Sequence, residues 1–403
     1  MKTREMQQEI LASAREFPVV SIYGPRQSGK TTLAQMCFPN KPWISFESLD
    51  NLRRASGDPR GFLEGLKKDG AILDEIQRAP ELMSYLQEYV DRDDRPGRFI
   101  LTGSHQATLK KGVAQSLAGR TAVMTLLPYT AEEIRQGGKE EPEDIFDLIF
   151  KGSFPRLHEQ GIRPARFYSS YVSTYLEKDL PSILEVRNRK AFADFLFLLG
   201  SRVGKLFNAS SLSNDIGVSA PTISAWVSAL EESNLILVLR PWYRNATCQV
   251  TKSNRIYFTD TGLAAWLAKY SRKEDVEGGA IRGELFENHV ILEIYKRLLN
   301  TGETPDLYFY RDKNGREVDL LVNRNGKLMP VEIKSAATFS TSFADGISFF
   351  RSTFHNCHDG VIVYNGNEAM PPYKGVAVAN PLSAGWKAKI LSGAAGTLRG
   401  RRS

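Results

Sequence analysis

The sequence predicts an α/β fold that opens with a parallel sheet. Two observations carry this prediction for the first 150 residues. Short apolar runs at 17–23, 71–73 and 98–101 alternate with helical stretches, and this alternation is typical of parallel strands joined by crossover helices. The pattern then becomes mainly helical up to about residue 275.

A second α/β region follows Gly278-Gly279. It should contain a helix at 283–299 and short strands at 307–311, 317–322, 328–334 and 360–364. We therefore expect three domains, 1–150, 151–275 and 276–392, and a basic C-terminal tail, 393–403, that is disordered.

Composition narrows the class of protein. The 403 residues are 42% hydrophobic and 25% charged. Their net charge of +7 leans towards a polyanionic partner such as DNA, but a modest excess on a chain this long is also common in proteins that bind none. Cys37, Cys248 and Cys357 are too few and too widely spaced for a disulfide framework. No signal-peptide core is present, and no apolar run approaches the ~20 residues that span a bilayer. We expect a cytoplasmic protein without a membrane partner.

The strongest motif is Gly24-Pro25-Arg26-Gln27-Ser28-Gly29-Lys30-Thr31, which fits G-x-x-x-x-G-K-[ST] without a gap. Its glycines let backbone N–H groups curl around phosphate oxygens, and the next helix points its positive end at the same anion. Lys30 would neutralise the β- and γ-phosphates, and the Thr31 hydroxyl would bind Mg²⁺. The motif therefore predicts a P-loop NTPase fold that binds ATP and Mg²⁺.

A second strand supplies the carboxylates that such a site requires. Gly70-Ala71-Ile72-Leu73 runs into Asp74 and Glu75, and parallel sheets bind their ligands at the carboxyl ends of strands. We expect Asp74 to hold Mg²⁺ through water. Glu75 should orient the attacking water as the general base.

Three further residues are candidates for sensing the γ-phosphate. A strand at 99–101 ends in Thr102, Gly103 and Ser104, so Ser104 or Thr102 should reach the phosphate. Arg120 is the candidate for an arginine that senses phosphate or acts across a subunit boundary. Arg26, inside the P-loop, is the weaker alternative.

Residues 208–240 predict a helix-turn-helix with wing strands at 235–239 and 255–258. A short helix closes at Gly217, Ser219 caps the second helix, and Pro221 stands early in it. The exposed positions of that helix carry no Arg or Lys to meet phosphate. Contact with DNA and a protein-docking role both remain open.

The C-terminal region concentrates carboxylates around a hairpin. Asn325-Gly326 predicts the turn, and alternation places Glu317 with Asp319, and Glu332 with Lys334, on one face of each strand. Glu287, on the preceding helix, would add a third carboxylate. Such a group can hold Mg²⁺ and polarise water for phosphodiester cleavage, although alternating charges are also typical of a solvent-exposed face.

In combination, these motifs resemble those of the two-part prokaryotic AAA-type ATPases whose C-terminal domain has a restriction-endonuclease-like fold. The resemblance covers nearly the whole chain. It rests on residues 24–32, which extend the P-loop motif to Thr32, and on 73–77, 101–104, 117–120, 152–155, 175–180, 317–319 and 331–335. Ser153 departs from the pattern, since a second glycine is usual there.

The resemblance also implies roles for individual residues. Lys30, Thr31, Asp74 and Glu75 would be the nucleotide-site residues, and a ring would be the expected assembly. Asp319 and Glu332 would be metal ligands, Lys334 the activating lysine, and Glu287 the helix carboxylate.

Three hypotheses follow from the sequence. The chain is a Mg²⁺-dependent, oligomeric ATPase that acts on DNA, or its C-terminal region is a working nuclease. Alternatively, the chain is an ATP-controlled regulatory or defence switch that binds a protein partner, with an inactive nuclease fold.

Overall fold

The computed structural model describes residues 2–66, 68–104, 117–137, 144–180, 186, 188–243, 253–366 and 370–392. Three features discussed above fall outside these residues. They are Cys248, the basic tail 393–403, and the side chains of 177–179.

A five-stranded parallel sheet forms the N-terminal part, in the order β2-β3-β4-β1-β5. This confirms the predicted α/β pattern. Its strands are β1 (Val19–Tyr23), β2 (Trp43–Ser45), β3 (Ala71–Asp74), β4 (Phe99–Gly103) and β5 (Thr121–Thr125). The helices are α1 (Gln7–Ser13), α2 (Lys30–Cys37), α3 (Leu49–Gly57), α4 (Pro59–Glu64) and α5 (Leu82–Arg92).

Both faces of this sheet are covered, because side chains alternate along each strand. On β1, Val19 and Tyr23 pack with α3, α4 and α5, whereas Val20 and Ile22 pack with α1 and α2. All five residues of β1 are buried. The strand that leads into the P-loop is therefore a buried interior strand, held between β4 and β5.

Helices dominate the chain from residue 131 to 300. They are α7 (Ala131–Gly137), α8 (Ile145–Lys151), α9 (Pro155–Gln160), α10 (Pro164–Tyr171), the π-helical segment η2 (Val172–Asp179), α12 (Arg189–Ser201), α13 (Ala209–Ile216), α14 (Ala220–Glu232), α15 (Thr261–Leu267), α16 (Lys273–Gly278) and α17 (Arg282–Asn300).

Ser153, the departure from the glycine pattern, lies in a buried polar junction between these helices. Its backbone N–H and its hydroxyl donate to the Asp260 carboxylate at 2.6 and 2.9 Å, and Lys296 donates to the same hydroxyl at 3.0 Å. Gly152 is required beside it, because φ is +72° and a Cβ there would lie 2.0 Å from the Tyr168 hydroxyl. The serine therefore adds hydrogen bonds that a glycine could not make.

The helix-turn-helix elements lie close to their predicted positions. The Ser219 hydroxyl accepts from the Thr222 N–H at 3.3 Å and caps α14, whose apolar stripe is buried. The strands β6 (Ile236–Pro241) and β7 (Arg255–Phe258) pair antiparallel. β6 also pairs with β8, however, so the strands expected as a wing extend the C-terminal sheet.

That sheet has seven strands in the order β12-β11-β10-β9-β8-β6-β7. Its remaining strands are β8 (Leu307–Arg311), β9 (Glu317–Arg324), β10 (Lys327–Lys334), β11 (Val361–Tyr364) and β12 (Ala377–Ala379). The helical segments near this sheet are η3 (Thr341–Ala344), α18 (Asp345–Thr353) and α19 (Trp386–Leu391). A further short helix, η1 (Ile76–Arg78), lies near the first sheet. Asn325 and Gly326 both have positive φ, which confirms the predicted tight turn.

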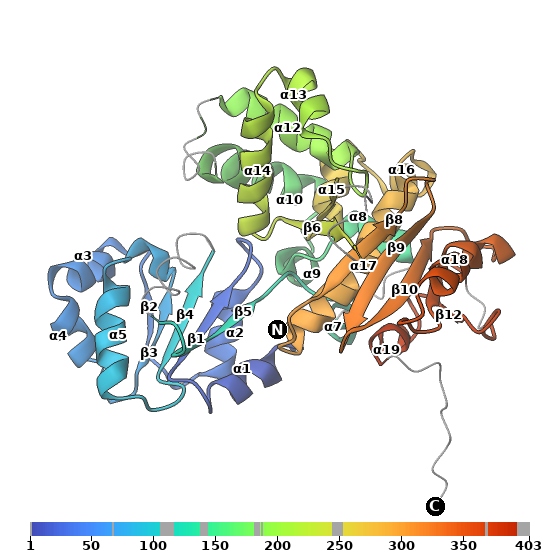
Figure 1. Cartoon of the computed structure of the whole chain (residues 1–403). Helices are drawn as coiled ribbons and strands as arrows, with labels where there is room; N and C mark the ends of the chain where they lie inside the picture. The colour runs from blue at the N-terminus through green and yellow to red at the C-terminus, as the bar shows by residue number, and fades with distance from the viewer. Residues whose placement is uncertain are drawn as a thin grey trace, which may run out of the picture.

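The two sheets lie apart, and α12, α13 and α14 stand above the space between them (Figure 1). Helix α17 packs on the C-terminal sheet and also contacts β5 of the first sheet. Helix α17 therefore contacts both sheets. Within the described part of the chain, none of the helices has the length and apolar character needed to cross a bilayer.

Candidate functional site

The P-loop leaves β1 at its carboxyl end and enters α2 at Lys30. Gly24 has φ of +150°, and a Cβ there would lie 2.0 Å from the Leu126 carbonyl oxygen, so only glycine fits. Gly29 has φ of +93° at the start of α2. Gln27, between them, is also left-handed, at φ of +65°. These conformations curl the backbone from Gly24 to Thr31 into a cradle.

The polar groups of this cradle match a phosphate ligand. Lys30 is buried and donates to the Gly24 and Pro25 carbonyls at 3.0 and 2.9 Å, folded back onto its own loop. Burial lowers the pKa of Lys30 to about 8, although Glu75 and Asp74 oppose the shift. The Ser28 hydroxyl is buried without a hydrogen-bond partner in the described structure. A buried ammonium and an unsatisfied hydroxyl are groups that an anion would satisfy.

Asp74 and two hydroxyls form the candidate metal site. Thr31, at the start of α2, donates to the Asp74 Oδ1 at 2.7 Å, and Thr102, from β4, donates to the same oxygen. Asp74 and Thr102 are both buried. Hard oxygen ligands of this kind suit Mg²⁺. Thr31 and Asp74 therefore fit the predicted ion, and Thr102 orients the carboxylate.

Glu75 occupies a strained backbone position at the end of β3. Its φ and ψ are +53° and +44°, which a glutamate rarely adopts. The Ser104 hydroxyl donates to the Glu75 carboxylate at 3.0 Å, and the Gln77 amide donates to the same oxygen. Ser104 thus positions Glu75, and Gln77 is a member of the site that sequence reasoning did not single out.

Arg120 lies at the amino-terminal end of the strands, whereas the P-loop lies at their carboxyl-terminal end. It is therefore too far away to sense phosphate in its own chain. It precedes β5, and its carbonyl accepts from the N–H of Val19, the first residue of β1. The P-loop starts at the other end of β1, roughly 16 Å away at 3.3 Å per residue. Arg120 pairs instead with Asp91 of α5. The prediction that Arg120 senses phosphate in its own subunit is therefore wrong. Its action on the nucleotide of a neighbouring subunit stays a prediction.

Other P-loop residues have distinct surroundings. The Arg26 side chain is exposed and lies 5.8 Å from the centre of the Tyr175 ring, on η2. Pro25 is buried and presents its carbonyl to Lys30. Thr32 is half-buried within α2.

The C-terminal residues Asp319, Glu332 and Lys334 come together on β9 and β10. The Lys334 ammonium contacts Glu332 at 2.6 Å and Asp319 at 3.4 Å. Burial opposes the shift, but the two carboxylates raise the pKa of Lys334 above its ordinary value. Burial, followed by the nearby Asp319, raises the pKa of Glu332 to about 8.

A residue that the sequence did not suggest occupies the centre of this carboxylate group. The Arg255 guanidinium, from β7, contacts Glu287 at 2.8 Å, Glu317 at 2.9 Å and Asp319 at 3.9 Å. Burial, with Asp319 as the next cause, raises the pKa of Glu287 to about 8. A pocket of about 480 Å³ opens beside Arg255 and these carboxylates.

The position of Arg255 contradicts the predicted role of Glu287, Asp319 and Glu332 as metal ligands. A guanidinium and the Lys334 ammonium stand where a divalent cation would have to bind. No group of three or more His, Cys, Asp or Glu side chains in the described residues is placed to hold a metal ion. The C-terminal carboxylates therefore do not fit Mg²⁺ in this arrangement, because Arg255 and Lys334 already contact them.

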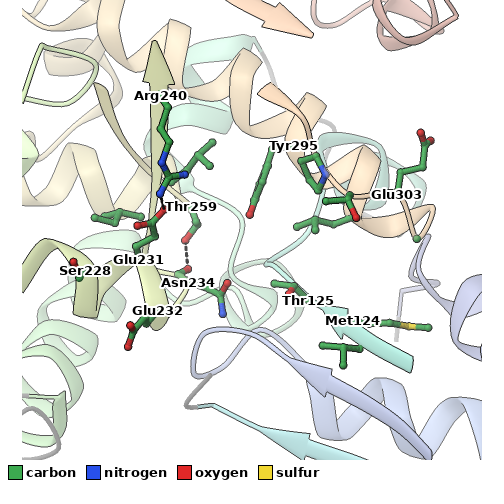
Figure 2. Close-up of a pocket in the computed structure, with 17 residues that line it drawn as sticks. Met124, Thr125, Ser228, Glu231, Glu232, Asn234, Arg240, Thr259, Tyr295 and Glu303 are labelled. Atoms are coloured by element: carbon green, nitrogen blue, oxygen red, sulfur yellow. Dashed lines mark hydrogen bonds and ion pairs between the residues drawn. The ribbon is translucent and has the colours of Figure 1, made fainter. Parts of the chain in front are cut away.

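A second pocket, of about 580 Å³, lies between the two halves of the molecule. Edge strand β5, the end of α14, β6 and the end of α17 line it (Figure 2). Glu231, Glu232 and Glu303 line it. Arg240 pairs with Glu231 at 3.3 Å, and Arg324 pairs with Glu303. Three carboxylates against two guanidinium groups leave a net negative charge, which disfavours a DNA phosphate near this end of α14.

Comparison with known families places the nucleotide site in context. Residues 16–135 match the model of an AAA domain. That stretch contains the cradle, Asp74 and Glu75, which together form the candidate nucleotide site. The match supports an AAA-type ATPase domain at residues 16–135. Two domains of unknown function match the rest of the chain, DUF8612 at residues 142–274 and DUF4143 at residues 282–384.

Relatives of this chain include two mycobacterial proteins. The uncharacterized protein Rv2008c of Mycobacterium tuberculosis is 29% identical over 355 residues, which cover 85% of this chain and 76% of that protein. The uncharacterized protein Mb2031c of Mycobacterium bovis has the same identity and coverage.

Two solved structures are similar at low identity. The Walker-type ATPase PABY2304 of Pyrococcus abyssi has a TM-score of 0.43 at 15% identity, over 66% of this chain and 97% of that one. RuvB of Thermotoga maritima has a TM-score of 0.33 at 17% identity, over 66% of this chain and 93% of its own.

Proposed function

We propose that this chain binds ATP with Mg²⁺ in the P-loop cradle and hydrolyses it. One observation carries the proposal: the Thr31 hydroxyl and the Asp74 carboxylate meet at 2.7 Å beside the buried Lys30. A P-loop site requires this hydroxyl and carboxylate together to hold its metal.

The residues divide the chemistry between them. Thr31 and Asp74 would hold Mg²⁺, which when bound supplies positive charge to the β- and γ-phosphates. Lys30 would exchange the carbonyls of its own loop for phosphate oxygens. Glu75 would accept a proton from water while the water oxygen bonds to the γ-phosphorus. The bond from that phosphorus to the bridging oxygen then breaks, and ADP and phosphate are released.

The direct test is phosphate release by the full chain. Wild type should release phosphate from ATP with Mg²⁺, and Lys30→Ala should not, because it removes the ammonium that neutralises the phosphates. Lys68→Ala is the matched control, since Lys68 is exposed and lies outside the site. Equal turnover in wild type and Lys30→Ala would overturn the proposal.

We further propose that the C-terminal region is a protein-binding platform under the control of the ATPase, rather than a metal-dependent nuclease. Two observations favour this hypothesis over the DNA hypotheses. Arg255 and Lys334 contact the carboxylates a nuclease would need, and the cleft below α14 is acidic. Action on DNA stays the alternative.

Branched and linear DNA incubated with Mg²⁺ or Mn²⁺ separates these hypotheses. The platform predicts no cleavage and only weak binding. Cleavage that Asp319→Ala abolishes would refute the platform. So would tight DNA binding that weakens steeply with salt, because that slope reports counterions released from phosphates.

A further inference from the structure

The N-terminal segment 2–6 lies against the P-loop, where Arg4 donates to the Ser28 carbonyl. Its central residue, Arg4, is 5% exposed. The Arg4 guanidinium donates to three groups: the Ser28 carbonyl at 3.0 Å, the Leu127 carbonyl at 2.7 Å and the Glu133 carboxylate at 2.9 Å. It also lies 4.8 Å from the centre of the Tyr129 ring.

The bond to Ser28 constrains one peptide group of the cradle. In a trans peptide, the carbonyl of one residue and the N–H of the next point in opposite directions. Arg4 holds the Ser28 carbonyl on its own side, so the Gly29 N–H must point away from Arg4. Gly29 has φ of +93°. Because glycine lacks a Cβ, its own φ and ψ angles do little to hold this peptide group in one orientation.

Arg4 is itself held rigidly. Glu133 accepts from Arg4 and also from the backbone N–H groups of Glu5 and Thr130, at 2.7 and 2.8 Å. Glu133 is 1% exposed, so this ion pair is shielded from water. A buried, bonded carboxylate fixes the guanidinium, and the guanidinium in turn fixes the Ser28–Gly29 peptide.

We infer that Arg4 is a positioning residue that pre-orients the P-loop backbone for the phosphates of the nucleotide. Without Arg4 the Ser28–Gly29 peptide can rotate, and binding must then fix it at an entropic cost. The effect should fall on nucleotide affinity, because Arg4 touches neither the metal ligands nor Glu75. This inference rests on the proposed ATP-binding function.

Lys2 provides a matched control within the same segment. It is 8% exposed, donates to the Ile134 carbonyl at 2.6 Å and lies 5.7 Å from the same Tyr129 ring. Lys2→Gln therefore loosens the segment without removing a bond to the P-loop.

The experiment compares the full chain with Arg4→Gln, Arg4→Lys and Lys2→Gln. Steady-state phosphate release gives KM and kcat, binding of a fluorescent ATP analogue gives Kd, and thermal unfolding reports the fold. Arg4→Gln should raise KM and Kd about tenfold, the loss expected for a buried charged hydrogen bond, with kcat nearly unchanged. Arg4→Lys should recover part of the affinity, and Lys2→Gln should bind as wild type does.

Unchanged KM and Kd in Arg4→Gln would overturn the inference. Equal losses in Arg4→Gln and Lys2→Gln would also overturn it, because they would show a general loosening. If Arg4→Gln does not fold, Arg4→Lys decides: wild-type affinity in that variant refutes the need for the forked guanidinium. A wild-type chain that neither binds nor hydrolyses ATP would instead refute the proposed function.

Discussion

Thr31 and Asp74 are 43 positions apart in the sequence, yet the hydroxyl of one donates to the carboxylate of the other at 2.7 Å. Parallel strands explain the meeting, because β1 and β3 run in the same direction and end at the same edge. Thr102, at the end of β4, donates to the same carboxylate. Three segments of the chain thus converge on one candidate metal position, next to the strained Glu75.

Glu75→Gln should lower kcat about 10²- to 10⁴-fold, the usual contribution of a general base. The amide keeps the shape of the side chain and its contact with Ser104, but it cannot accept a proton from water. Nucleotide affinity should stay near the wild-type value, so phosphate release and binding of an ATP analogue must both be measured.

Glu81→Gln is the control for this substitution, since Glu81 is an exposed acid outside the site. Turnover above a tenth of the wild-type rate in Glu75→Gln would assign the role of base elsewhere.

Sequence predicted the parts of this site that lie within contiguous motifs. The cradle from Gly24 to Thr31 and the acid pair at Asp74 and Glu75 each depend on local order, with glycines at the two ends of the loop and carboxylates where a strand ends. The strand and turn pattern around Asn325-Gly326 was predictable for the same reason.

Residues that act across long separations were not predictable. Arg255 is 62 positions from Glu317 and stood in a segment expected to be a wing strand. Its role became visible only because β6 and β7 join the C-terminal sheet. Arg4 likewise meets Glu133 from 129 positions away. Neither arginine belongs to a motif, so no local pattern could reveal its partner.

Arg120→Ala should bind the ATP analogue as tightly as wild type, because Arg120 lies at the opposite end of the strands from the P-loop. If Arg120 acts on the neighbouring subunit, the variant should hydrolyse ATP far more slowly. Mixing Arg120→Ala with Lys30→Ala should then restore turnover, since some interfaces would combine an intact P-loop with an intact arginine. Wild-type turnover in Arg120→Ala alone would exclude this role.

Arg255→Gln should lower the free energy of unfolding by about 1–3 kcal/mol, the usual cost of leaving a buried polar group without its hydrogen-bond partner. The substitution leaves the buried Glu287 carboxyl without the guanidinium that donates to it. Urea unfolding of the full chain measures the loss.

Arg311→Gln serves as the control for Arg255, because Arg311 contacts the same Glu317 at 3.3 Å from a more exposed position. Its loss should stay below about 1 kcal/mol. Equal losses in the two variants would mean that Arg255 is no more important than a surface cation.

His289 should make the chain lose stability in mild acid. It is buried on α17, and its Nε2 has no hydrogen-bond partner in the described structure. Burial lowers the pKa of His289 from 6.5 to about 4, although the nearby Glu293 opposes the shift. The folded chain therefore keeps His289 neutral where the unfolded chain protonates it. Its contribution is complete above pH 6.5 and is lost as the pH falls towards about 4.

The expected loss over that range is about 3 kcal/mol, since one pKa unit corresponds to about 1.36 kcal/mol. Urea unfolding between pH 7 and pH 5 should show a shallower fall for His289→Gln than for wild type, because glutamine does not titrate. His355→Gln, at an exposed position, should keep the wild-type slope. Parallel curves for wild type and His289→Gln would show that the pH dependence arises from other groups, because a buried neutral imidazole must contribute a slope that glutamine removes.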